Sequence, residues 1–171
     1  LPLLDGQLEQ EWREADAASV SFECVAISPV GELAERVELF HLMQLVGDLF
    51  RNALRAIQRS GGENGRILLF LGKRREGYEI KMRDTGAPFP KEVLERLGER
   101  GLTTGGTGHG MADMLETLAR YRASLEIQEE MEATAFTKTV NLLFDNEAMV
   151  RVNCPAQSIV YERHLPELTK I

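Results

Sequence analysis

The feature that most constrains the fold is an apolar run from residue 39 to residue 57, in which hydrophobic side chains recur every three or four positions. This spacing predicts a helix that packs one face against a core. A polar stripe on the same helix is a common feature of a solvated surface when it stands alone, so its role depends on the motifs that follow it. The apolar positions are Leu39, Leu42, Met43, Leu45, Val46, Leu49, Phe50, Ala53, Leu54 and Ile57, and the polar stripe is Gln44, Asp48, Asn52 and Arg55.

A second motif places an acid at the end of a strand. Tyr78, Ile80 and Met82 alternate with charged residues, and Asp84 continues their apolar face before the chain turns through Thr85-Gly86. A carboxylate there needs hydrogen-bond donors, which suits an amino group such as the exocyclic amine of adenine. Guanine presents an oxygen at that place, and two facing acceptors without a hydrogen bond would cost about 1 to 3 kcal/mol. The alternative is a simple turn in which Asp84 caps local amides.

A glycine-rich stretch from residue 98 to residue 110 leads directly into a second helical pattern. Glycine lets backbone amides approach phosphate oxygens, and the first turn of a helix offers unpaired N–H groups and a positive dipole end. Phosphate is therefore predicted at residues 108 to 111, and a flexible linker is the alternative. Because glycine loses much entropy on ordering, we expect the lid from Gly98 to Thr107 to be mobile without nucleotide. The apolar positions of the helix are Met111, Met114, Leu115, Leu118 and Ala119.

In this order, the motifs resemble those of the superfamily of ATP-binding domains found in gyrase, heat-shock chaperones, histidine kinases and mismatch-repair proteins. The chain is most similar to a sensor histidine kinase catalytic domain. Residues 48–53 resemble its N box, 84–86 its G1 box, 99–104 its F box and 106–111 its G2 box. The resemblance covers residues 1 to about 144.

The resemblance implies a role for each matching position. Asn52 would be a Mg²⁺ ligand, Arg55 would replace a lysine that meets phosphate, and Asp84 would bind the adenine amine. Asp48, Asn52 and Arg55 form the implied catalytic set. The implied nucleotide-binding set is Asp48, Asn52, Arg55, Asp84, Gly86, Pro88, Thr103, Thr104, Gly106, Thr107, Gly108, His109, Gly110 and Met111.

Two positions depart from the histidine kinase pattern. Pro88 stands where the G1 box usually has its second glycine, a form that also resembles anti-sigma-factor serine kinases. Asp48 stands where histidine kinases more often have asparagine, and where hydrolysing branches place a glutamate that activates water. Two roles are open for Asp48: support of slow ATP hydrolysis, or orientation of the metal site, which we favour.

The resemblance implies that the chain binds Mg²⁺ and ATP and donates the γ-phosphoryl group to a histidine on a separate dimerisation domain. His41, His109 and His164 lack the family's phosphoacceptor context, so the acceptor is expected outside this chain. A response regulator would be the next partner in a two-component pathway, and the parent protein would be a homodimer. Two alternatives are an anti-sigma-factor-type protein serine kinase and a non-catalytic nucleotide-binding or protein-interaction module.

The predicted architecture is α+β, a two-layer α/β sandwich of the Bergerat type, with helices on one face of a mainly antiparallel mixed sheet. A chain of 171 residues with 43% hydrophobic residues can bury one core. Residues 1–17 are expected to be an exit helix from a missing dimerisation domain, and residues 18–144 the ATP-binding domain. Residues 145–171 form an extension of unknown role, in which apolar alternation allows an extra hairpin or an edge strand.

Charge and hydropathy exclude other classes. A net charge of −7 argues against a nucleic-acid surface. With neither a stretch of about 20 apolar residues nor a signal peptide, we expect a cytoplasmic chain, or the cytosolic part of a sensor whose membrane contact lies in missing segments. Cys24 and Cys154 have no metal-binding spacing and are expected to be reduced thiols.

Overall fold

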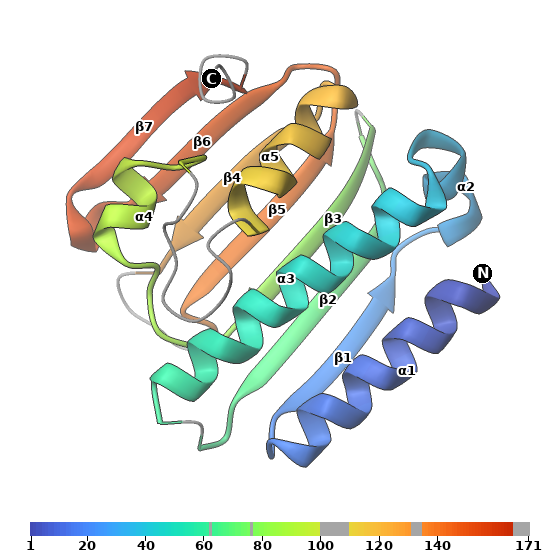
Figure 1. The fold of residues 1–171 in the computed structure, drawn as a ribbon, viewed down its shortest axis with the longest axis horizontal. Helices are drawn as coiled ribbons and strands as arrows, with labels where there is room; N and C mark the ends of the chain where they lie inside the picture. The colour runs from blue at the N-terminus through green and yellow to red at the C-terminus, as the bar shows by residue number, and fades with distance from the viewer. Residues whose placement is uncertain (62, 76, 100–109, 131–134, 166–171) are drawn as a thin grey trace.

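A single seven-stranded mixed sheet carries the helices on one face (Figure 1). The structure is a computed structural model that describes residues 1–61, 63–75, 77–99, 110–130 and 135–165. The strand order is β1-β2-β3-β5-β4-β6-β7. None of the helices in these ranges is long and apolar enough to cross a membrane.

The helices and strands follow the hydrophobic patterns of the sequence. The helices are α1 (Pro2–Ala17), α2 (Val30–Arg36), α3 (Leu39–Arg59), α4 (Lys91–Glu95), α5 (Gly110–Arg120) and the 3₁₀ turn η1 (Pro155–Gln157). The strands are β1 (Ser21–Ala26), β2 (Arg66–Arg74), β3 (Gly77–Asp84), β4 (Ser124–Glu129), β5 (Lys138–Phe144), β6 (Met149–Cys154) and β7 (Ile159–His164).

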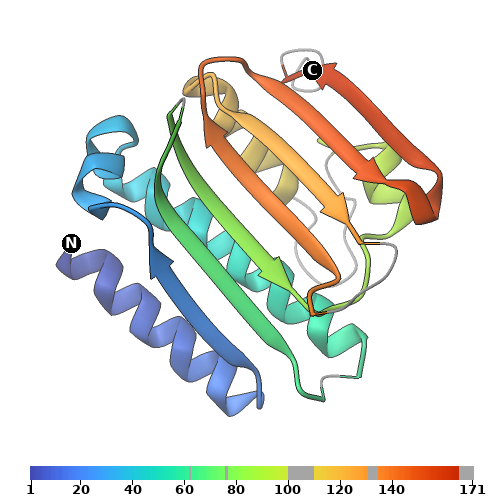
Figure 2. The same cartoon turned by 180° about the vertical axis from the view of Figure 1, so that it is seen from behind.

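Strand pairing in the sheet is mostly antiparallel, as predicted. The pairs β2–β3, β3–β5, β4–β5 and β6–β7 are antiparallel, whereas β1–β2 and β4–β6 are parallel. Figure 2 shows the opposite face of the sheet, which the described helices leave open. The α+β two-layer prediction is therefore confirmed.

The core lies between the sheet and the apolar face of α3. Leu42, Val46, Leu49 and Ala53 are at most 2% exposed and pack over β2 and β3. α5 lies beside α3 and covers β4, while α1 lies on the other side of α3 along β1 (Figure 1). The long helix predicted from residues 39–57 is confirmed, and it is the element that both α1 and α5 contact.

The chain after Phe144 forms a hairpin that extends the same sheet. β6 pairs with β4, and β7 is the edge strand. Val150, Val152 and Cys154 are almost fully buried and belong to the main core. The extra hairpin and edge strand allowed by the sequence are therefore both present.

Candidate functional site

The turn after β3 packs directly against the last turns of α3. The backbone N–H of Ala87 donates a hydrogen bond to the carbonyl of Ala56 at 2.9 Å. A Cβ atom at position 86 would lie 2.5 Å from the carbonyl carbon of Ala56 and from the nitrogen of Ile57. Only glycine allows this approach of strand and helix, so Gly86 is required by packing.

Asp84 is buried in this turn, with 2% of its surface exposed. Its Oδ1 atom accepts hydrogen bonds from the backbone N–H of Gly86 at 2.8 Å and from Nζ of Lys138 at 3.1 Å. Lys138 is equally buried and also donates to the carbonyl of Ala87 at 3.0 Å. Burial raises the pKa of Asp84 and lowers that of Lys138, and the ion pair opposes both shifts.

The second carboxylate oxygen of Asp84 has a different environment. Among the described residues, both hydrogen bonds to this carboxylate end on Oδ1. Oδ2 therefore retains its capacity to accept a hydrogen bond from a ligand. Asp84 is thus held in place by the protein through one oxygen and can recognise an amino group through the other.

Lys138 is a site residue that the sequence analysis missed. It lies on β5 in alternation with Val140 and Leu142, which are buried, so a lysine stands where the strand pattern requires an apolar residue. A buried lysine needs a partner. A lysine at an apolar position of a strand was the one signal of a buried ion pair that the sequence offered. The sequence does not reveal the acidic partner, because it does not show that β5 lies next to β3.

Phe89, one residue after Pro88, is held through both of its backbone polar groups. Its N–H donates to Oε1 of Glu129 at 2.9 Å, and its carbonyl accepts from Nε2 of Gln157 at 3.0 Å. Gln157 also donates to Oε2 of Glu129 at 2.9 Å. The segment that follows the acid-bearing turn is therefore held by β4 and by η1 in the C-terminal hairpin, whereas Pro88 itself is exposed.

The polar stripe of α3 lies only partly in solvent. Asp48, Asn52 and Arg55 are half-buried, whereas Gln44 is exposed. Asp48 pairs with Arg51 one turn later. Burial raises the pKa of Asp48, the charge of Asp113 raises it further, and Arg51 opposes both effects. Asp113 lies in the first turn of α5, a helix that contacts α3.

These elements share one side of α3. The first turn of α5 lies near Asp48, and the turn after β3 contacts Ala56, two helical turns further along, or about 12 Å. Asn52 lies midway between them on the same stripe. The charge of Arg59 acts on both Asp84 and Lys138, which places the end of α3 beside the buried acid.

Part of the predicted phosphate site lies outside the described residues. Gly110 and Met111 are described and begin α5, where Gly110 is exposed and Met111 half-buried. The lid is described only at Gly98 and Glu99. The predicted residues that lie outside the described ranges are Thr103, Thr104, Gly106, Thr107, Gly108 and His109.

The donor atoms on α3 fit Mg²⁺. Asn52 offers an amide oxygen, a hard ligand of the kind that Mg²⁺ prefers, and Asp48 lies one turn earlier on the same helix, where it could orient the site. Within the described ranges, no group of three or more His, Cys, Asp or Glu side chains is arranged to hold a metal ion. Mg²⁺ is typically held by one or two protein oxygens together with substrate phosphates and water, so this small ligand set suits it.

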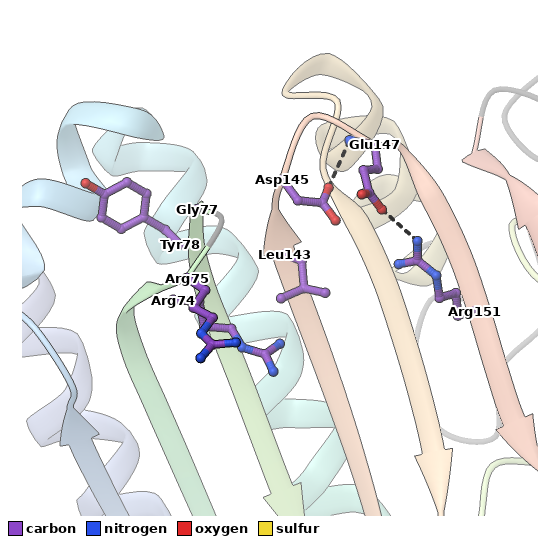
Figure 3. A pocket seen from close by; sticks show the side chains of 8 residues that line it. All are labelled: Arg74, Arg75, Gly77, Tyr78, Leu143, Asp145, Glu147 and Arg151. Carbon is purple, nitrogen blue, oxygen red and sulfur yellow. Dashed lines mark hydrogen bonds and ion pairs between the residues drawn. The ribbon is translucent and has the colours of Figure 1, made fainter.

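A separate hollow of about 370 Å³ lies at the opposite end of β3 from Asp84 (Figure 3). Gly77 and Tyr78 line it, together with arginines from two strands. Arg74 pairs with Glu79, and Arg151 pairs with Glu147. Two of its arginines, Arg74 and Arg151, therefore already have acidic partners, and the hollow does not belong to the α3 site.

The fold is that of an ATPase-type domain, as a comparison with known families shows. Residues 38–145 match the family of histidine kinase-, DNA gyrase B-, and HSP90-like ATPases. The match spans more than half of the chain, and the chain belongs to this family.

Two bacterial relatives are a probable sensor kinase and a sensor protein. The chain is 28% identical over 100 residues to a probable C4-dicarboxylate sensor kinase of Halalkalibacterium halodurans. The aligned region covers 57% of this chain and 19% of that protein. It is 26% identical over 105 residues to the sensor protein CitS of Bacillus subtilis, covering 60% of this chain and 19% of that protein. The chain thus spans about a fifth of the length of the curated relatives it matches.

Solved structures show the same fold. The mycobacterial sensor histidine kinase MprB has a TM-score of 0.60 at 17% identity, covering 82% of this chain and 91% of that chain. A nucleotide-free catalytic domain of histidine kinase ThkA gives 0.61 at 16% identity, covering 81% and 91%. Full-length ShkA in complex with AMPPNP gives 0.61 at 17% identity, covering 82% of this chain and 28% of ShkA. The fold is therefore that of histidine kinase catalytic domains.

Proposed function

We propose that this chain binds ATP with Mg²⁺ and donates the γ-phosphoryl group to a histidine on a separate dimerisation domain, as the catalytic part of a sensor histidine kinase. The observation that carries the proposal is that three parts of the predicted site lie on the same side of α3. There the buried acid of the β3 turn, the half-buried stripe and the start of α5 border one region. One relative named as a probable sensor kinase, another named as a sensor protein, and the similar fold of ShkA, whose structure was solved in complex with AMPPNP, support it.

Each residue has a distinct task in this proposal. Oδ2 of Asp84 accepts a hydrogen bond from the adenine amine while Lys138 and Gly86 hold Oδ1. The amide oxygen of Asn52 holds Mg²⁺, and Asp48 orients this site from the same helix. When bound, Mg²⁺ neutralises charge on the phosphates.

Phosphoryl transfer then depends on positioning and charge. Arg55 and the N–H groups at Gly110 and Met111 offset the negative charge of the phosphates. No nucleophile from this domain is required, because the attacking group is the histidine nitrogen of the partner domain. A homodimeric parent protein with its membrane contact elsewhere, a cytosolic position for this domain and a response regulator as the next acceptor complete the proposal.

Calorimetric titration of the chain with ATP and Mg²⁺ tests the site. Asn52→Ala should abolish the Mg²⁺-dependent part of the affinity, whereas Gln58→Ala, at an exposed position of the same helix, should leave it unchanged. The double variant Asp84→Asn with Lys138→Met, which leaves no unpaired buried charge, should weaken ATP binding about tenfold or more and reduce the preference over GTP. Wild-type affinity in both variants would refute the proposed site.

Pro88 favours one second candidate, a protein serine kinase of the anti-sigma-factor type. The two activities differ in the stability of their products, since phosphohistidine is acid-labile and phosphoserine is not. Labelling from γ-labelled ATP in the presence of the dimerisation domain, followed by acid treatment, separates them. An acid-stable label would replace the histidine kinase proposal with the serine kinase.

A further inference from the structure

Gln157 lies in η1, the turn between β6 and β7, beyond the family match that ends at residue 145 (Figure 1). Pro155 begins this turn, and the backbone N–H of Ser158 closes it by donating to the carbonyl of Pro155 at 2.9 Å. Cys154 and Ile159, on either side of the turn, pair with each other in the hairpin and are buried in the main core. The backbone at Gln157 is therefore fixed relative to the sheet.

The amide of Gln157 connects two segments that are far apart in the sequence. Nε2 donates to the carbonyl of Phe89 at 3.0 Å and to Oε2 of Glu129 at 2.9 Å, which uses both N–H bonds of the amide. Oε1 of Glu129 accepts a hydrogen bond from the backbone N–H of Phe89 at 2.9 Å. Because Glu129 is only 6% exposed, its carboxylate depends on donors from the protein. These three hydrogen bonds connect the three residues to one another and fix the backbone at Phe89.

Phe89 and Glu129 both act on Lys138. Nζ of Lys138 lies over the ring of Phe89, 5.2 Å from the ring centroid. Burial lowers the pKa of Lys138, Asp84 opposes this shift most, and the charge of Glu129 adds to that opposition. Nζ of Lys138 in turn donates to Oδ1 of Asp84 at 3.1 Å. A series of contacts therefore runs from Gln157 to the acid that is proposed to bind adenine.

Recognition of an amine by Oδ2 of Asp84 depends on the orientation of the whole carboxylate. The two oxygens belong to one planar group, so a shift of Nζ of Lys138 that moves Oδ1 also moves Oδ2. Binding groups have to be held within about 0.5 Å of the productive geometry by supporting contacts. Removing the amide of Gln157 takes away the donor that Phe89 and Glu129 share. The groups that act on Lys138 would then no longer be fixed.

We propose that Gln157 is a positioning residue of the nucleotide site, which keeps the carboxylate of Asp84 in the orientation that distinguishes adenine from a base with an oxygen in place of the amine. It acts through Phe89, Glu129 and Lys138, since both N–H bonds of its amide are used away from Asp84. This inference rests on the proposed function, because it concerns the base that the site would bind.

A comparison of two nucleotides tests this proposal. Inosine triphosphate carries a carbonyl oxygen in place of the exocyclic amine of ATP, the group that Asp84 would contact. Calorimetric titration of the full chain in the presence of Mg²⁺ gives a dissociation constant for each nucleotide. Their ratio reports on base recognition and does not depend on the fraction of folded protein. In Gln157→Met, which keeps the length of the side chain and removes both donors, the preference for ATP should fall about threefold or more.

Two further variants separate the hydrogen bonds from a general effect on the fold. Gln157→Lys places an ammonium group within reach of the same two oxygens, so it should retain the wild-type preference for ATP. Gln128→Met makes the methionine substitution at an exposed position of β4, next to Glu129 in the sequence, and should retain the preference as well.

An unchanged preference for ATP in Gln157→Met would overturn the assignment of Gln157. Equal losses in Gln157→Met and Gln157→Lys, or in Gln157→Met and Gln128→Met, would overturn it too, because the loss would then not follow the donated hydrogen bonds. A wild-type chain that binds both nucleotides equally, or neither, would refute the proposed function itself and this inference with it.

Discussion

At the scale of single residues, Lys138 determines how Asp84, the acid of the proposed nucleotide site, is held. Asp84 and Lys138 are each 2% exposed and form an ion pair at 3.1 Å. Removing one partner from a buried pair leaves the other charge uncompensated, which costs more than the pair itself contributes. The two residues therefore act as one unit.

Lys138→Met should destabilise the fold by about 3 kcal/mol at neutral pH, because it leaves the Asp84 carboxylate buried without a cation. Without Lys138, the pKa of Asp84 rises further above its ordinary value of 3.8. A raised folded-state pKa means that stability is lost as the pH increases through it, so the loss in the variant should be smallest below pH 4. Urea unfolding across pH 3.5 to 8 measures this. Lys91→Met, an exposed control, should change stability little, and an equal loss at all pH values would contradict the expectation.

The sequence revealed half of this pair. Alternation along residues 78–84 placed Asp84 on a buried face, and the structure bears this out. The partner follows 54 positions later, and cross-strand neighbours are set by the strand order of the whole sheet. Local periodicity carries no information about that order, which is why Lys138 was missed.

At the scale of elements, the contact between α3 and the turn after β3 sets the geometry of the site. The backbone at Gly86 approaches Ala56 so closely that no side chain fits between them. The hydroxyl of Thr137 donates to the carbonyl of Gly86 at 2.6 Å and fixes the turn from the other side. These contacts fix the distance between the turn after β3 and the end of α3.

Gly86→Ala should disrupt this contact. Its Cβ would lie 2.5 Å from helix backbone, so α3 or the turn must move, at a cost of about 1 to 3 kcal/mol or more. Thermal unfolding should show a lower midpoint. Gly110→Ala is the matched control, because a Cβ there meets no atom of the described residues within 4 Å. Similar midpoints for Gly86→Ala and the wild type would show that the turn is not locked against α3.

Long, strongly periodic elements were predictable, and short ones were not. α3, α5 and β3 follow from hydrophobic spacing. α2 has 7 residues and α4 has 5, each preceded by a proline, and so few positions give no clear period. They are stabilised by tertiary contacts, such as the hydrogen bond at 2.7 Å from the Tyr161 hydroxyl to the carbonyl of Leu94 in α4.

At the scale of the whole molecule, the C-terminal hairpin connects the core to the site. Val150, Val152 and Ile159 are buried in the main core. Gln157, between the two strands, holds the carbonyl of Phe89. The family match ends at residue 145, so this hairpin lies beyond the matched region. The sequence showed its alternation but not its pairing with β4.

Truncation after Phe144 should prevent stable folding. It removes several buried side chains worth about 1.5 to 3 kcal/mol each, against a typical total stability of about 5 to 15 kcal/mol, and exposes the edge of β4. Circular dichroism and analytical ultracentrifugation should show loss of the cooperative transition and aggregation. Truncation after Leu165, which retains β7, should preserve both fold and solubility. A monomeric 1–144 chain with a wild-type midpoint would show that the hairpin is dispensable.

The buried lysine has one further consequence. Asp84 already has Lys138 as its counter-ion before any ligand arrives. Binding of the adenine base in the proposed site would therefore not require uptake of a proton from the solvent. Recognition at that end of the site would then stay constant over the pH range in which the lysine keeps its charge.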